Sequence, residues 1–298
     1  MVTPTPYAEA IARIPVEAKT IDLLGGTTHY WVYGPADART TIVVAHGYRG
    51  EHHGLEPVIA ELPDIRWIGP DMPGFGESTP LTEVPHSIPG YARWLTAFID
   101  ALGLTGTAVM LGHSFGTIIS SQAIADGAKP PALILVNPIA ISGLDGPNRA
   151  ATAVTVWFYR FARKLPRPIG TWMLKHWLVT HFINVNLVKT RDKDLRKWIY
   201  AEHHSYFNRF DNRDVVVEAF EASISTHVGE FADRMTVPTL LVAAELDEIT
   251  PITAVRHLAE AMPDAMLTEL KNVGHLIHYE VPQLAAAAIR SFLAALRP

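Results

Sequence analysis

A serine at position 114 stands between two glycines, in the stretch GHSFG at 112–116. An apolar run typical of a buried strand precedes it, and a helix-like pattern follows at 117–126. Small residues on both sides let the chain turn tightly and hold a strained serine with its hydroxyl exposed. We therefore predict that Ser114 is a nucleophile. The backbone N–H of Phe115, at the helix N-terminus, would point to where negative charge develops on an attacked carbonyl.

A serine hydroxyl is a weak nucleophile at neutral pH and needs a positioned base. His275 follows the predicted last strand, MLTEL, in a loop that begins with a glycine and continues into apolar residues. His278 lies close by, but its place at the start of the last helix suits a general base less well. We predict that His275 takes the proton of Ser114.

The base in turn needs a carboxylate that fixes its tautomer and stabilises the imidazolium. Asp247 ends the strand-like run TLLVAAELD, where a turn into the next helix should begin. Glu245 and Glu248 compete for the role, and a carboxylate at this place could instead cap the helix. We predict that Asp247 orients His275.

A second donor for the oxyanion is expected in the stretch AHGYRGEHHG at 45–54, directly after a predicted strand. Its His-Gly step lets the backbone approach the serine, so we assign the second donor to the N–H of Tyr48. We expect His46 to hold this loop by hydrogen bonds. No role is assigned to Arg49, His52 or His53.

Strands and helices alternate along most of the chain, which predicts an α/β fold with a doubly wound, mostly parallel sheet. Continuous apolar runs suit strands that are covered on both faces. The expected strands lie at 41–47, 66–71, 108–114, 132–138 and 239–247, after a hairpin arm at 27–34. The expected helices lie at 87–102, 117–126, 253–262 and 281–296.

The segment 140–230 breaks this alternation, because it has no convincing strand and is rich in aromatic residues. Residues 140–213 carry 13 Lys and Arg against 5 Asp and Glu. We predict a helical cap at 140–230, inserted into a core made of 1–139 and 231–298. The basic cap could attract an anionic lipid surface or recognise a carboxylate, phosphate or coenzyme A group, although a solvated helix face is the simpler interpretation.

The composition narrows the classes of function. The 298 residues carry a net charge of −5, which argues against a general nucleic-acid binder. There are no cysteines, so disulfides and thiolate metal sites are excluded. No apolar run is long enough for a transmembrane segment. We also expect no signal peptide and a cytoplasmic location.

Five motifs together resemble the α/β-hydrolase superfamily: HGYRG (46–50), DMPGFGES (71–78), GHSFG (112–116), ELDEITP (245–251) and GHLIH (274–278). The likeness covers about 25–138 and 231–298, and the chain order Ser, Asp, His is the order found in that superfamily. It implies a serine hydrolase of the esterase or lipase type, with 140–230 in the place of the family's cap. Asp71 and Ser78 take structural roles in such a turn.

The same resemblance limits the substrate. Haloalkane dehalogenases and epoxide hydrolases of this fold use an aspartate nucleophile, whereas position 114 is serine. The expected reaction is cleavage of a small-molecule carboxylic ester with an apolar acyl group, through an acyl-enzyme and without metal or organic cofactor. The alternatives are an acyltransferase, a C–C bond hydrolase (disfavoured by Leu276, where such enzymes often have tryptophan), and a non-catalytic ligand receptor.

Overall fold

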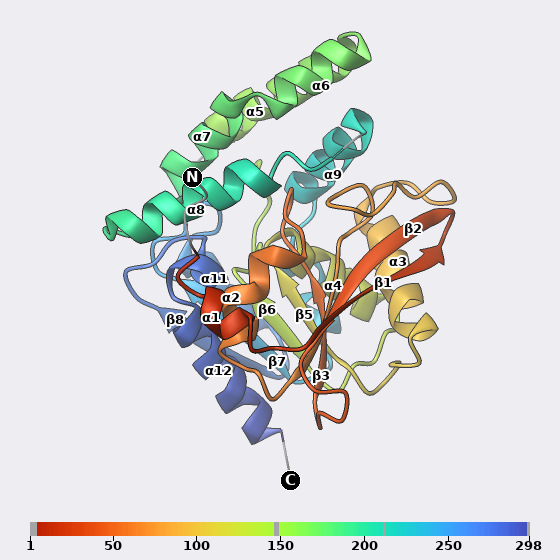
Figure 1. Ribbon diagram of the computed structural model, residues 1–298, viewed down its shortest axis with the longest axis vertical. Helices are drawn as coiled ribbons and strands as arrows, with labels where there is room; N and C mark the ends of the chain where they lie inside the picture. Colours follow the sequence, from red (N-terminus) through yellow and green to blue (C-terminus); the bar gives the residue numbers. More distant parts are fainter. Residues whose placement is uncertain (1–4, 146–148, 211, 297–298) are drawn as a thin grey trace.

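An eight-stranded sheet runs through the centre of the computed structural model, which describes residues 5–145, 149–210 and 212–296 (Figure 1). The spatial order of the strands is β1-β2-β4-β3-β5-β6-β7-β8. Strand β2 pairs antiparallel with β1 and β4, and every other pairing is parallel. The strands are β1 (Val16–Leu23), β2 (Gly26–Tyr33), β3 (Thr41–Ala45), β4 (Arg66–Pro70), β5 (Val109–His113), β6 (Leu133–Val136), β7 (Thr239–Ala244) and β8 (Ala265–Leu270).

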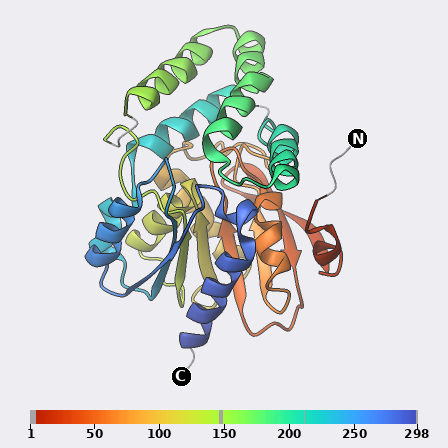
Figure 2. The ribbon, with the colours of Figure 1, turned by 90° about the vertical axis from the view of Figure 1, so that its left-hand side faces the viewer.

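Helices cover both faces of the sheet (Figure 2), which explains why the central strands are apolar throughout. Along β3, Val43 and Ala45 belong to one hydrophobic cluster, whereas Ile42 and Val44 belong to the other. The first face packs against α3 (Ile88–Ala101), α4 (Phe115–Ala125) and α10 (Ile252–Ala261). The second packs against α2 (Glu56–Ala60) and α12 (Pro282–Ala295). The predicted doubly wound α/β class is confirmed.

Short helices complete the connections. They are α1 (Ala8–Ile11), η1 (His52–Leu55), η2 (Val228–Arg234) and α11 (Ile277–Glu280). Helix α4 begins two residues earlier than expected, because the turn at Ser114 leads directly into it.

Between β6 and β7 the described residues form five further helices. They are α5 (Arg149–Lys164), α6 (Arg167–Lys175), α7 (Trp177–Leu187), α8 (Lys193–Tyr206) and α9 (Arg213–Ser225). These helices lie together at one end of the molecule, away from the C-terminus (Figures 1 and 2). Within the described ranges, no helix combines the length and the apolar character that crossing a membrane requires.

Candidate active site

Ser114 lies in the sharp turn between β5 and α4. Its backbone has φ 51° and ψ −114°, a conformation that a side-chain-bearing residue rarely adopts. The flanking glycines are needed for close packing. A Cβ on Gly112 would lie 2.5 Å from the carbonyl oxygen of Gly116, and one on Gly116 would lie 1.9 Å from that of Ala45. The turn therefore requires both glycines, in the places where the motif has them.

The three predicted polar side chains meet in one chain of hydrogen bonds. Ser114 Oγ donates to His275 Nε2 over 2.8 Å, and His275 Nδ1 donates to Asp247 Oδ2 over 2.7 Å. The imidazole and the carboxylate are buried. The competitors His278 and Glu245 do not join this chain of bonds: His278 is in α11, and Glu245 accepts from the backbone of Asn272. Glu248 pairs with Lys189.

Asp247 is held as a carboxylate although it is buried. Burial alone would raise its pKa, but the charge and hydrogen bond of His275 and the amides of Ile249 and Thr250 together lower it below the ordinary value. Those two amides donate to Oδ1 over 2.8 and 3.2 Å. The carboxylate therefore caps the turn after β7 and also faces the imidazole.

Asn137 is a further member of this network that the sequence analysis missed. It follows β6, has φ 49°, and its side-chain amide donates to Asp247 Oδ2 over 3.0 Å. Its own N–H donates to Val242 O of β7. Its place directly after a buried strand was the available signal, since ends of neighbouring parallel strands meet at one edge of the sheet.

Two other histidines lie beside His275. The ring of His113 is 5.9 Å from that of His275 and 4.2 Å from that of His278. Burial, followed by the neighbouring histidines, lowers the pKa of His113 to about 3. Burial lowers the pKa of His278 well below its ordinary value as well. Both rings therefore stay neutral near pH 7 and add no positive charge beside His275.

The loop after β3 brings a second backbone segment to Ser114. A Cβ on Gly47 would lie 3.4 Å from that of Ser114. Among the residues that the structure describes, the N–H groups of Tyr48 and Phe115 donate no hydrogen bond to protein. His46 holds the loop, since its Nδ1 donates to Gly47 O and its Nε2 accepts from the N–H of Met72, each over 2.8 Å.

Arg49, to which the sequence analysis gave no role, is almost completely buried. It has φ 59° and follows Tyr48 directly. Its guanidinium reaches into the helices that follow β6, and its carbon Cζ lies 5.1 Å from the centre of the Phe210 ring. It donates to Phe207 O, Tyr159 Oη, Leu174 O and Asn208 Oδ1, over 2.8 to 3.2 Å. This side chain ties the loop at Tyr48 to those helices.

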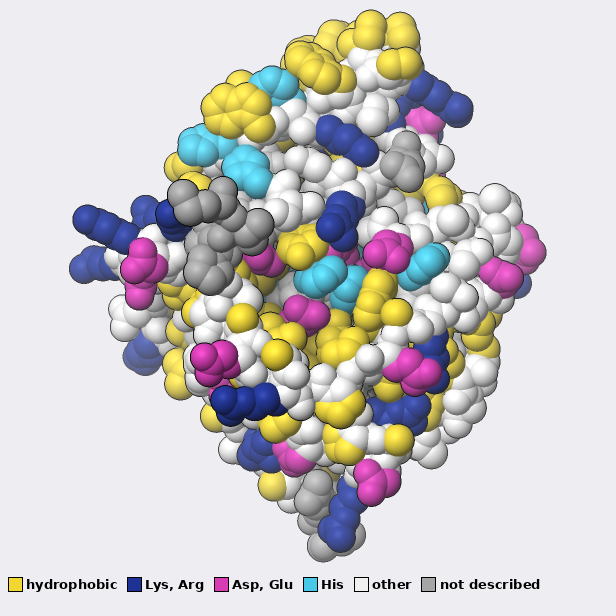
Figure 3. Space-filling view, in the orientation of Figure 1, with side chains coloured by type: hydrophobic (Ala, Val, Ile, Leu, Met, Phe, Trp, Pro, Cys, Tyr) yellow, Lys and Arg dark blue, Asp and Glu magenta, His cyan; other side chains and the backbone are white. Residues whose placement is uncertain are grey.

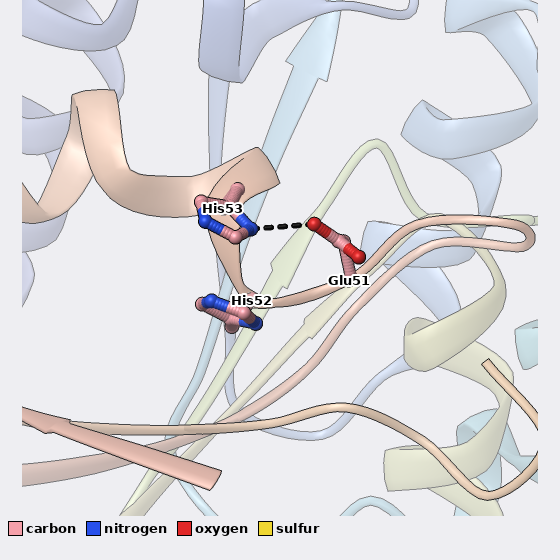
Figure 4. Close-up of side chains that lie close together, drawn as sticks. All are labelled: Glu51, His52 and His53. Atoms are coloured by element: carbon pink, nitrogen blue, oxygen red, sulfur yellow. Dashed lines mark hydrogen bonds and ion pairs between the residues drawn. The ribbon is translucent and has the colours of Figure 1, made fainter. Parts of the chain in front are cut away.

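Glu51, His52 and His53 form the described group of side chains that comes closest to a metal site (Figure 4). Their ligand atoms lie within 4.8 Å of one another, but one nitrogen of each histidine already bonds a carboxylate. His52 Nδ1 donates to Asp71 Oδ1, and His53 Nδ1 donates to Glu51 Oε1. The centres of the two rings also lie 3.8 Å apart, with the ring planes tilted by 38°. We therefore assign no metal to this group.

His52 and His53 instead pack against aromatic rings on both sides of the loop. Trp31 of β2 lies against His52, with ring centres 3.3 Å apart, and Tyr206 of α8 lies against His53 at 4.4 Å. The loop after β3 is thus packed between the sheet and α8, in addition to the bonds of Arg49.

Two cavities meet at Ser114. One, of about 230 Å³, lies beside the loop after β3 and is lined by side chains such as Leu55 and Tyr206. The other, of about 400 Å³, lies under α5, α7 and α9. Its walls are mainly apolar and include Ile139, Ile141, Phe182, Phe220, Ile224 and Ile249. A bound molecule could therefore extend to two sides of the serine hydroxyl.

The sequence and the fold were compared with known proteins. The model of the alpha/beta hydrolase family matches residues 42–288, most of the chain. The chain belongs to the alpha/beta hydrolase family. It is 25% identical over 287 residues to the uncharacterized hydrolase YugF of Bacillus subtilis, covering 94% of this chain and 98% of that protein.

Two further comparisons agree with this membership. The chain is 25% identical over 283 residues to the putative carbamate hydrolase RutD of a Caulobacter species, covering 93% and 98% of the two proteins. The solved structure of an enol-lactonase from Burkholderia xenovorans superposes with a TM-score of 0.78 at 19% identity, covering 93% of this chain and all of that one. These relatives support hydrolase activity for this member of the family.

Proposed function

We propose that the protein is a serine hydrolase that cleaves carboxylic esters with an apolar acyl group. The observation that carries the proposal is the hydrogen-bonded chain from Ser114 Oγ through His275 to Asp247, next to two backbone N–H groups without a protein partner. A nucleophile, a base, an orienting acid and donors for an oxyanion are the parts that acyl transfer needs.

In the first half of the reaction, Ser114 Oγ attacks the ester carbonyl and His275 Nε2 takes its proton. The carbonyl oxygen becomes negative and accepts hydrogen bonds from the N–H groups of Tyr48 and Phe115. His275 then gives its proton to the departing alcohol. Asp247, kept ionised by its surroundings, stabilises the imidazolium throughout.

In the second half, water attacks the acyl-enzyme while His275 again accepts and returns a proton. The acid is released and Ser114 is restored. Every step uses groups of this chain and water, so the proposed reaction requires no metal or organic cofactor.

We further propose that residues 140–230 act as a cap over a core made of 1–139 and 231–298. Helices α5, α7 and α9 contribute walls to the larger cavity at Ser114, through residues such as Thr155, Phe182 and Phe220. The apolar walls would receive the acyl group, since burial of apolar surface favours binding there. The ester class is therefore assigned from the lining of the site.

A chain-length series of p-nitrophenyl esters, from acetyl to palmitoyl, tests the proposal. Wild type should turn over, and Ser114→Ala should lose roughly three to six powers of ten in rate, because the nucleophile is gone. The preferred chain length would report the size of the acyl site. Ser121→Ala alters a buried serine of α4, the helix that follows Ser114. It is the matched control and should keep full activity.

A fluorophosphonate probe provides the second measurement. It should label wild type and Ser121→Ala on Ser114, and leave Ser114→Ala unmodified. If wild type shows neither ester turnover nor labelling of Ser114, the proposed mechanism is wrong, and a ligand receptor of this fold would describe the protein better.

A further inference from the structure

Helix α7 buries two polar residues and exposes several apolar ones. Thr180 and Asn184 are completely buried, and both bond to residues in or just after α8. Thr180 Oγ1 accepts from Asn208, and Asn184 Oδ1 accepts from His203. Leu178, Phe182 and Val185 are more than half exposed. A helix of a globular protein normally turns its apolar stripe to the core. In α7 several large apolar side chains are instead exposed, whereas Ile183 and Leu187 are half-buried at the cavities beside Ser114.

The exposed apolar surface continues onto α6 through a row of rings. The ring centres of Trp172 and His176 lie 5.1 Å apart. Those of His176 and Trp177 lie 6.0 Å apart, and those of Trp177 and His181 lie 5.8 Å apart. We define the apolar cap face as Trp172, Trp177, Leu178, Phe182 and Val185, whose exposed fractions are 52–66%. Figure 3 shows hydrophobic side chains gathered at this end of the molecule, over α5 to α7, with histidine, Lys and Arg side chains nearby.

Large exposed apolar patches on soluble domains mark surfaces that bind something. Tryptophan is enriched where protein meets the headgroup level of a membrane, since its ring is apolar and its N–H is polar. The segment 140–230 has 13 Lys and Arg against 9 Asp and Glu, although the whole chain is negative. Positive charge beside an apolar face matches a surface of anionic lipid. We propose that the apolar cap face docks peripherally on bilayers that contain anionic lipid.

The location of this face is consistent with delivery of an apolar molecule to Ser114. Phe182 belongs to the apolar cap face and also lines the larger cavity, together with Asn186 of the same helix and Ser114. A molecule that leaves a bilayer at α7 would therefore reach the cavity without crossing bulk water. This last step rests on the proposed ester hydrolysis, whereas docking itself does not.

Vesicle flotation tests the docking directly, with vesicles of phosphatidylcholine alone and of phosphatidylcholine mixed with phosphatidylglycerol. Wild type should float with the mixed vesicles, bind less to phosphatidylcholine alone, and be released by salt. Trp172→Gln/Trp177→Gln should weaken partitioning on the order of a hundredfold, because two large rings no longer enter the interface. Ser114→Ala should bind as wild type does, so that loss of activity and loss of docking are separable.

A pair of single variants guards against misfolding of the double variant. Leu178→Gln removes one leucine of the apolar cap face, and Leu284→Gln removes an equally exposed leucine of the core helix α12. The first should weaken partitioning by roughly tenfold and the second should leave it unchanged. Thermal melting followed by circular dichroism checks that each variant is folded.

Three results would overturn the proposal. The first is that wild type binds neither kind of vesicle, and the second is that Leu178→Gln and Leu284→Gln behave alike. The third is that light scattering finds a dimer that does not bind vesicles and that dissociates in Trp172→Gln/Trp177→Gln. The last result would assign the same face to a second copy of this chain.

Discussion

Asp247 and His275 approach Ser114 from the loops after β7 and β8, whereas Tyr48 approaches it from a loop whose next residue is anchored in the helices after β6. Asp247 is held by Asn137 and by two amides of its own turn, all within the core. Arg49, by contrast, donates its hydrogen bonds to residues between Tyr159 and Asn208. In the proposed site, the hydrogen bonds of the acid–base pair therefore stay outside the helices after β6, whereas the loop that carries the proposed oxyanion donor is bonded to those helices.

This difference has a physical consequence. The hydrogen bonds of His275 and Asp247 stay outside the inserted segment, although Lys189 of that segment pairs with Glu248, next to Asp247. A loop tied across the boundary would move when those helices move. Variants at Asp247 and at Arg49 separate the acid–base pair from the loop of Tyr48.

The largest loss of activity is expected for a change in Asp247, the proposed acid partner of His275. Asp247→Asn should lower kcat about ten-thousandfold, because the amide can neither fix the required tautomer of His275 nor stabilise its positive charge. Esterase assays with Glu245→Gln as the matched control measure this, since Glu245 bonds the backbone of Asn272 instead. Equal losses in the two variants would contradict the role proposed for Asp247.

A smaller loss of activity is expected for a change in Arg49, which anchors the loop of Tyr48. Arg49→Lys removes the fork of donors that ties Tyr48 to the helices, so the oxyanion donor would be displaced and kcat should fall by roughly a hundredfold. Labelling of Ser114 by a small phosphonate should still occur, since the acid–base groups are untouched. The readouts are kcat, KM and the rate of labelling.

Arg213→Lys is the control for that variant. Arg213 is also a buried arginine, but it donates to Ala162 O and Leu165 O within the inserted helices. Both substitutions should cost about 1–3 kcal/mol of unfolding free energy. If Arg213→Lys reduces kcat as much as Arg49→Lys does, then Arg49 supports the helices in general and does not position Tyr48.

The smallest effect, counted per pH unit, concerns the stability of the folded protein. The pKa of His113 is about 3 in the folded protein and near 6.5 when exposed, so the unfolded state binds one more proton between these values. Stability should therefore fall as the pH drops from 6.5 towards 3. His113→Gln should make that fall shallower by about 1.4 kcal/mol per pH unit.

Urea unfolding across this pH range measures the slope. His257→Gln, at an exposed position of α10, removes a histidine that meets solvent in both states and should keep the wild-type slope. A slope in His113→Gln that matches wild type would show that His113 is not held neutral by burial.

The sequence alone predicted the features that depend on neighbouring residues. The turn at Ser114 needs small residues at 112 and 116, because the backbone passes within contact distance of other carbonyl groups. Apolar runs predicted the central strands, which have four to six residues, since both faces of a parallel sheet are buried. These requirements are local, so the motif and the fold class could be recognised without any coordinates.

Only the tertiary structure decided which distant residues meet. Asn137 and Asp247 are 110 positions apart, as are Arg49 and Tyr159, and nothing in either sequence neighbourhood specifies its partner. Helix α7 gives the strongest example, because it is apolar on more than one side and buries two of its polar residues. Packing against α8 buries Thr180 and Asn184, where each finds a hydrogen bond, and leaves the tryptophan and phenylalanine outside.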